Sequence, residues 1–149
     1  MTQKTPMRMQ DKIILRVVSK ALIPPILLFA LYVQFHGDFG PGGGFQAGVI
    51  FAAGLVLFGV IFGLDAVQEV FPPIWVEILT AVGVLLYGGV GVVSIMLGGE
   101  FLNYDVLHLP GPMHGQHLGI FLVELGVGIT VASAMTAIFY FFAGRATKR

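Results

Sequence analysis

The chain lacks basic residues over most of its length. All eight Lys and Arg residues of the 149-residue sequence lie before Ala21 or after Gly144. Charged residues make up 11% of the sequence, whereas soluble proteins carry about 25%. A long apolar stretch with so few charges cannot supply the surface of a soluble domain. The sequence therefore excludes the soluble globular class and predicts an integral membrane protein.

Cysteine is absent as well, which excludes disulfides and thiol chemistry. The formal net charge is zero and the positive charge is confined to the two ends, which argues against a nucleic-acid partner. No nucleotide cradle, nucleophile triad or flavin motif occurs, so we expect neither an enzyme nor a bound cofactor. His114 and His117 have metal-like spacing but no third ligand fixed nearby, so we predict no metal site.

Long apolar segments separated by turn residues account for nearly the whole sequence, since hydrophobic residues make up 56% of it. A helix needs about 20 apolar residues to cross a bilayer. We predict an all-α fold, a single four-helix membrane domain over residues 1–149. The four predicted spans are residues 17–35, 44–64, 73–97 and 116–142.

The basic ends predict the orientation in the membrane. An even number of spans puts both termini on one side, and the positive-inside rule makes that side the cytoplasm of a cell-membrane protein. The loops at residues 36–43 and 98–115 then face outward. Pro24 and Pro25 should kink the first span, and the carbonyl groups they free need a neighbouring helix.

A glycine-dense turn, residues 40–48, separates the first two spans. Proline fixes its own φ angle, and three successive glycines resist helix formation, so the chain must reverse here. Such a reversal lies at a bilayer face, where the backbone finds water or another protein. We interpret this turn and the proline pair as structural or subunit-contact residues. They are Pro24, Pro25, Pro41, Gly42, Gly43, Gly44, Phe45, Gln46 and Gly48.

Glu124 lies about two turns inside the fourth span. An ionisable group at such a depth is costly unless it faces protein or water, so it is a functional-site hypothesis. His117 precedes it by two turns on the same helix face, and together they could form the outer end of a proton or cation path. Glu124 could equally hold subunits together. Asp38 and Glu77 are weaker candidates for the path, near the outer and inner membrane faces respectively.

Two segments resemble a known family. The pattern Phe29-x-x-Tyr32-x-x-x-His36-Gly37 before the glycine turn, and the segment Leu122–Gly128, resemble the B subunit (MnhB/MrpB type) of the multisubunit Na⁺/H⁺ antiporter, the Mrp complex. The resemblance covers nearly the whole chain. It implies other hydrophobic Mrp-type subunits and membrane lipid as partners, and Na⁺ and H⁺ as transported ions.

Other functions stay open at this point. The same subunit type occurs in related membrane-bound hydrogenase-like complexes, so an ion pump of that kind, or one like complex I, is the alternative host. A stand-alone small multidrug exporter also has four spans and a membrane carboxylate. That class is disfavoured because the carboxylate here lies in the last span.

Overall fold

The computed structural model describes residues 12–37, 42–106 and 114–147, and the regular elements in these ranges are all helices. Four helices are long and apolar enough to cross a membrane, which confirms the predicted all-α membrane fold. They are α1 (Ile13–His36), α2 (Gly44–Phe62), α4 (Pro73–Met96) and α5 (His114–Thr147), joined by the short α3 (Leu64–Val70) and the 3-10 helix η2 (Tyr104–Val106). The side of the membrane on which the termini lie stays a prediction.

Some helices extend beyond the predicted spans. α1 begins at Ile13, ahead of the predicted span of residues 17–35, and it runs without a break through Pro24 and Pro25. The basic residues of its first turns are accommodated by aromatic contact. Cζ of Arg16 lies 5.6 Å from the centre of the Phe62 ring, and Nζ of Lys20 lies 5.8 Å from it. These cation–π contacts join the start of α1 to the end of α2.

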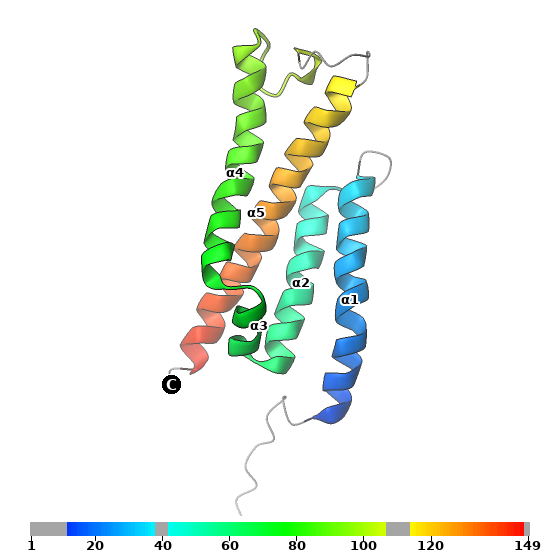
Figure 1. The fold of residues 1–149 in the computed structure, drawn as a ribbon, viewed down its shortest axis with the longest axis vertical. Helices are drawn as coiled ribbons and strands as arrows, with labels where there is room; N and C mark the ends of the chain where they lie inside the picture. The colour runs from blue at the N-terminus through cyan, green and yellow to red at the C-terminus, as the bar shows by residue number, and fades with distance from the viewer. Residues whose placement is uncertain (1–11, 38–41, 107–113, 148–149) are drawn as a thin grey trace, which may run out of the picture.

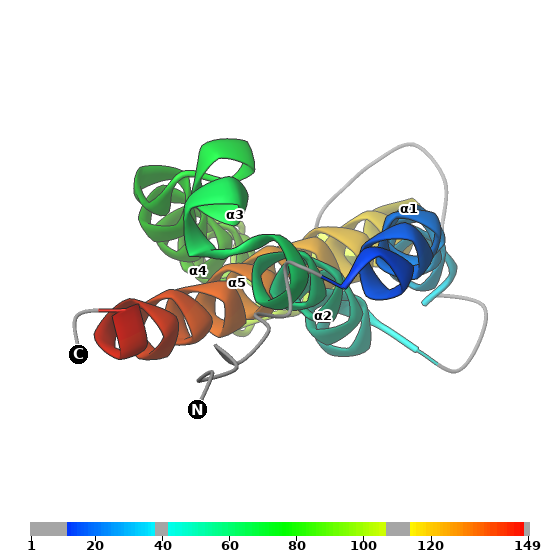
Figure 2. The ribbon, with the colours of Figure 1, turned by 90° about the horizontal axis from the view of Figure 1, so that it is seen from below.

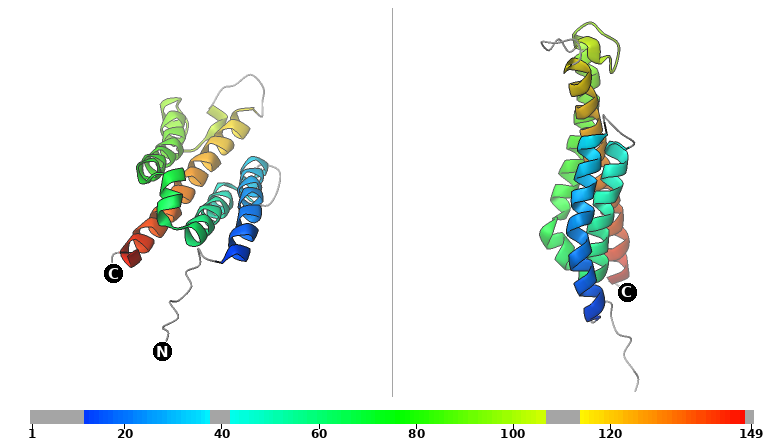
Figure 3. Two further views of the ribbon diagram at one scale, coloured as in Figure 1. Left: turned by 60° about the horizontal axis from the view of Figure 1, so that its bottom comes forward. Right: turned by 90° about the vertical axis from the view of Figure 1, so that its right-hand side faces the viewer.

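The long helices lie side by side in the order α4, α5, α2, α1 (Figures 1 and 2). α5 crosses this row obliquely and packs against α4 on one side and α2 on the other. Seen edge-on, the row is thin (Figure 3, right). α2 is therefore the most buried of the four spanning helices and α1 the least. A single layer of apolar helices leaves two broad faces for lipid or for neighbouring proteins.

Glycines set how closely the helices approach. A β-carbon added to Gly83 of α4 would lie 2.7 Å from the carbonyl oxygen of Gly126 in α5, and one added to Gly126 would lie 2.9 Å from that of Gly83. On the opposite face of α5, the Gly128 carbonyl oxygen lies 2.7 Å from where a β-carbon of Gly48 in α2 would be. The two α5 glycines are two residues apart, so they face opposite directions and admit one helix each.

A small core fixes the end of the row near the C-terminus. Val67 of α3, Val76 of α4 and Tyr140 of α5 are buried together there. The Tyr140 hydroxyl donates a hydrogen bond to the carbonyl of Phe71 at 2.7 Å. Gly63, with φ at 103°, is the N-cap of α3, and Asp65 lies in the first turn of that helix. Its carboxylate is still near the positive end of the helix there.

Candidate functional site

The Glu124 carboxylate lies against the residues that flank the reversal between α1 and α2. A β-carbon on Gly37, at the end of α1, would lie 2.5 Å from Oε2 of Glu124. One on Gly43, which precedes α2, would lie 2.8 Å from Oε1. Any residue other than glycine at these two positions would place a β-carbon in this space and displace the carboxylate. Gly37 and Gly43, which flank the reversal, therefore make room for a charged group of α5.

The backbone at the start of α2 is equally close to α5. Gly44 is the first residue of α2, and a β-carbon there would overlap the carbonyl group of Glu124. Gly42 has φ at 137°, in a region that favours glycine. Gly43 is the N-cap of α2, so the carboxylate lies beside a helix N-terminus, where the partial positive charge of the backbone favours an anion. The glycine run thus serves both the chain reversal and the approach to Glu124.

The unequal height of the two hairpins explains how a residue inside α5 meets this turn. The α4–α5 hairpin extends beyond the α1–α2 hairpin at the same end of the molecule (Figure 1). Glu124 lies well after the start of α5 at His114. It is therefore level with the end of the shorter hairpin and not with its own loop.

The other predicted ion-path residues lie apart from Glu124. His117 is exposed on the first turns of α5. Glu77 is exposed on α4 and lines a shallow depression with Ala137, which lies about 20 Å further along α5 than Glu124. Asp38 lies outside the described residues. The described part of the chain thus gathers no set of three Asp, Glu or His side chains that could hold a metal ion.

The predicted contact residues fall into two groups. Gly42, Gly43, Gly44 and Gly48 pack inside the protein, as described above. The side chains of Phe45 and Gln46, and Pro24 and Pro25 of α1, are exposed. Pro41 lies outside the described residues. The exposed group is available for contact with lipid or with another protein.

The aromatic residues before the turn form a stack on the exposed side of α1. The rings of Phe29 and Tyr32 have centroids 6.1 Å apart, and those of Tyr32 and His36 are 5.1 Å apart. Three- and four-residue spacing puts them on one face of the helix. The motif at residues 29–37 therefore presents a continuous aromatic edge outside the helix row.

Sequence reasoning missed Gln34. This residue lies near the end of α1, and its side chain is only 7% exposed. Its Oε1 lies against Gly128, in the space that a side chain at that position would fill. Its Nε2 is buried and has no hydrogen-bond partner among the described residues. A glutamine inside a predicted span was a signal for burial against protein, but its partner helix could not be read from the sequence.

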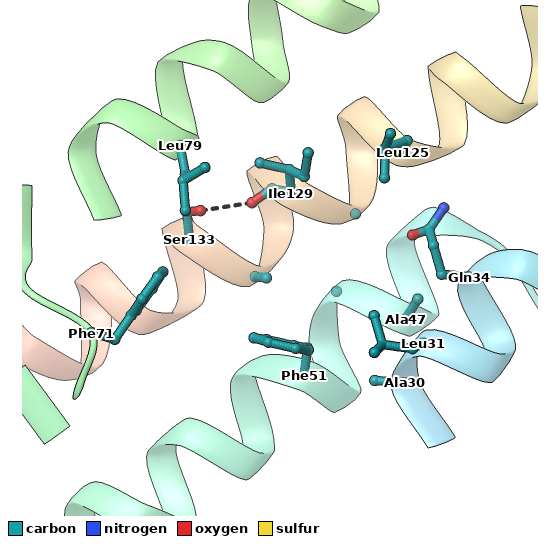
Figure 4. Close-up of a pocket in the computed structure, with 13 residues that line it drawn as sticks. Ala30, Leu31, Gln34, Ala47, Phe51, Phe71, Leu79, Leu125, Ile129 and Ser133 are labelled. Atoms are coloured by element: carbon teal, nitrogen blue, oxygen red, sulfur yellow. Dashed lines mark hydrogen bonds between the residues drawn. The ribbon is translucent and has the colours of Figure 1, made fainter. Parts of the chain in front are cut away.

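Gln34 borders an apolar pocket of about 230 Å³ among α1, α2, α4 and α5 (Figure 4). Ser133 is the other polar side chain of the lining, and its hydroxyl donates to the carbonyl of Ile129 at 2.8 Å. The remaining lining is aliphatic, aromatic or glycine. It comprises Ala30, Leu31, Ala47, Gly48, Phe51, Phe71, Leu79, Leu125, Gly128, Ile129 and Ala132.

Comparison with known proteins gives a consistent result. A family model described as "Domain related to MnhB subunit of Na+/H+ antiporter" matches residues 14–137. The provisionally named antiporter subunit mnhB2 of Staphylococcus haemolyticus is 31% identical over 136 residues, which are 85% of this chain and 96% of that protein. Its counterpart in Staphylococcus aureus (strain Newman) is 30% identical over 139 residues, or 91% of this chain and 96% of that protein. The range matched by the family model includes the glycine turn and Glu124 of this chain.

Proposed function

We propose that this chain, which belongs to the MnhB family, is a membrane subunit of a multisubunit Na⁺/H⁺ antiporter. The observation that carries this proposal is the family match, which extends from the first turns of α1 into the last third of α5. The similarity therefore spans all four long helices and is not confined to one hydrophobic helix. Other subunits of the same antiporter are its partners.

The thin helix row supports a role inside a larger assembly. Large apolar side chains are exposed on every spanning helix, among them Leu28 of α1, Leu85 of α4 and Phe141 of α5. Lipid covers such surfaces, but so do the helices of neighbouring subunits, and a one-layer protein presents both faces to them. We propose that other hydrophobic antiporter subunits cover part of this surface.

Glu124 is the residue through which this subunit contributes to the ion path. It is the carboxylate of α5 that meets the ends of two other spanning helices, where backbone polar groups can share in binding a cation. A carboxylate can exchange H⁺ or bind Na⁺ in turn, which is the chemistry that antiport requires. With both basic termini in the cytoplasm, this site belongs to the outer end of the path.

Replacing Glu124 by Gln tests this role. The amide keeps the size of the side chain but neither ionises nor binds Na⁺ as a carboxylate does. We expect Na⁺/H⁺ antiport in everted membrane vesicles, followed with a pH-sensitive dye, to fall to background while the complex still assembles on native gels. Glu69→Gln makes the same change at an exposed carboxylate of α3, at the opposite end of α2 from the glycine turn, and is the matched control, for which antiport should persist.

The possible results distinguish the role of Glu124 from the function of the whole subunit. Full antiport in assembled Glu124→Gln complexes would refute a part of Glu124 in the ion path. Loss of the complex itself would assign Glu124 to assembly instead. Deletion of the whole subunit with unchanged antiport would refute the function proposed for the chain.

A further inference from the structure

We infer that the free side of α4 binds a spanning helix of another antiporter subunit, and that a Lys or Arg of that helix forms an ion pair with Glu77. The inference rests on the proposed function, which provides the other subunits. α4 is at the end of the helix row, and the spanning helix that packs along it is α5 (Figures 1 and 2). The side of α4 that faces away from α5 is therefore open to a partner.

Glu77 lies at a depth where the surface of the protein is apolar. It lines a shallow depression with Ala137, which lies about 15 Å before the end of α5 at Thr147. Phe141 and Phe142 follow Ala137 and are 73% and 70% exposed. Exposed apolar side chains therefore continue beyond Glu77 toward this end of the molecule. A carboxylate at such a depth is costly unless it faces protein or water.

The described part of this chain contains no partner for Glu77. Its carboxylate makes neither an ion pair nor a hydrogen bond with another described residue. No Lys or Arg occurs between Ala21 and Gly144, so the helices beside Glu77 carry no cation. Lys20 of α1 lies over the ring of Phe62, and α1 is at the other end of the row. The positive charge that balances Glu77 therefore comes from another protein.

The residues in line with Glu77 favour a helix as that partner. Ala81, Val84 and Gly88 follow it at intervals of four, three and four residues, the spacing along which one helix packs against another. Val84 is 54% exposed, and a β-carbon added to Gly88 would meet no atom within 4 Å. Glycine weakens a helix, and no other helix of this chain uses the space at Gly88. Small residues at positions 81 and 88 would admit a partner helix closely.

Lipid matches this surface less well than a helix with a basic residue. Acyl chains would cover the apolar side chains but would offer the Glu77 carboxylate no hydrogen-bond donor, and an unpaired charge in apolar surroundings is costly. An Arg side chain can donate two parallel hydrogen bonds to a carboxylate, and a Lys side chain balances its charge. The partner is therefore a spanning helix with one such residue at the depth of Glu77.

A photocrosslinking amino acid at residue 84 tests the contact in the assembled complex. Benzoylphenylalanine at Val84 should crosslink to one helix of another antiporter subunit, identified by mass spectrometry. The same amino acid at Val82 is the matched control. Val82 is 45% exposed, but two residues along a helix it faces the opposite direction. It should not give this crosslink.

Charge exchange tests the ion pair. Glu77→Lys should lower co-purification of the crosslinked subunit at least about tenfold, because like charges brought together in an interface are strongly unfavourable. Replacing the basic residue of the partner helix by Glu in the same complex should restore co-purification. Glu69→Lys makes the same change at an exposed carboxylate of α3 and should co-purify as the wild type does. The exchange can be tried at each basic spanning residue in turn, so it does not depend on the photocrosslinker.

The outcomes separate this inference from the proposed function. Normal assembly of Glu77→Lys, or a loss that no charge exchange restores, would overturn the ion pair. Crosslinks from residue 84 only to lipid or to a second copy of this chain, within an assembled complex, would overturn the partner helix and leave the proposed function intact. Purification of the wild-type chain without any other subunit would refute the proposed function itself.

Discussion

The two sides of α5 pack in similar ways but differ in chemistry. Toward α4, Gly126 faces Gly83, and the Thr130 hydroxyl donates to the carbonyl of Gly126 at 2.8 Å, within its own helix. Toward α2 and α1, Glu124 presents a carboxylate to the glycine turn, and Gly128 meets the Gln34 amide. The first side satisfies its polar group internally. The second side brings polar groups from three helices together.

This difference indicates that the two sides of α5 have different roles. Small residues bring α4 and α2 equally close to α5, so close approach alone does not mark a functional site. The α2 side adds a charge and a buried amide nitrogen that has no hydrogen-bond partner in the described part of the chain. Both carry a cost in stability that apolar packing does not. We therefore expect substitutions on the two sides to have similar effects on assembly and different effects on transport.

Substituting the contact glycines should have the largest effect. Gly44→Leu and Gly83→Leu would each force a side chain into the backbone of α5, and such overpacking costs about 1–3 kcal/mol or more. We expect both variants to lose the assembled complex, measured by co-purification of the other subunits. Gly88 of α4 has open space around its β-carbon position, so Gly88→Leu is the matched control and should assemble. Normal assembly of Gly44→Leu would refute the close approach of α2 and α5.

Gly37→Ala should separate transport from packing. The added methyl group would meet the Glu124 carboxylate, the flexible end of a side chain, and the Gly42 carbonyl at 3.0 Å. The carboxylate can move aside, so the complex should assemble. Displacing a functional group by about 1 Å can cost up to a hundredfold in rate, and we expect antiport to fall at least about tenfold. An antiport rate equal to the wild type would show that the position of the carboxylate is unimportant.

Tyr140→Phe tests a polar contact of α5 that lies far from Glu124. The change removes the hydroxyl that donates to the partly buried carbonyl of Phe71 and that also bonds to the carbonyl of Val67. We expect a loss of about 1 kcal/mol in stability, seen as a lower thermal midpoint of the complex in detergent. Antiport per assembled complex should be unchanged, and a selective loss of transport would extend the functional region to this end of α5.

Thr130→Val should have the smallest effect. Valine keeps the shape of threonine, and the hydroxyl it removes bonds only to the preceding turn of α5 among the described contacts. Hydrogen bonds of this kind contribute about 0.6 kcal/mol in membrane proteins. We expect assembly and antiport close to wild type. A large loss of antiport in Thr130→Val would erase the contrast between the two sides of α5.

The sequence predicted the helices better than their contacts. Length and hydropathy were enough to predict the four spans. The sequence also singled out Glu124 and the glycine turn. It did not reveal that the two meet, because a contact between residue 43 and residue 124 depends on the relative height of two hairpins.

Gln34 shows the same limit. From the sequence it is one polar residue near the end of an apolar helix, and nothing nearby in the chain explains it. In the structure its side chain lies against Gly128, and it is buried because α1, α2 and α5 pack around it. The sequence also could not show whether Glu77 and Glu124 lie close together, because they are on different helices. In the structure Glu77 of α4 lies near Ala137, which is about 20 Å along α5 from Glu124.

The sequence by itself determined that this is a membrane protein with four spanning helices, and to which family it belongs. Hydropathy and local motifs depend only on residues that are close together in the chain, so they can be read without a structure. Tertiary structure decided that the helices form a thin row with α5 inside it, that Gly37, Gly43 and Gly44 lie against Glu124, and that Gln34 borders a pocket. These features depend on the depth at which distant segments pack, and glycines allow that packing wherever they face a partner helix without specifying which partner it is.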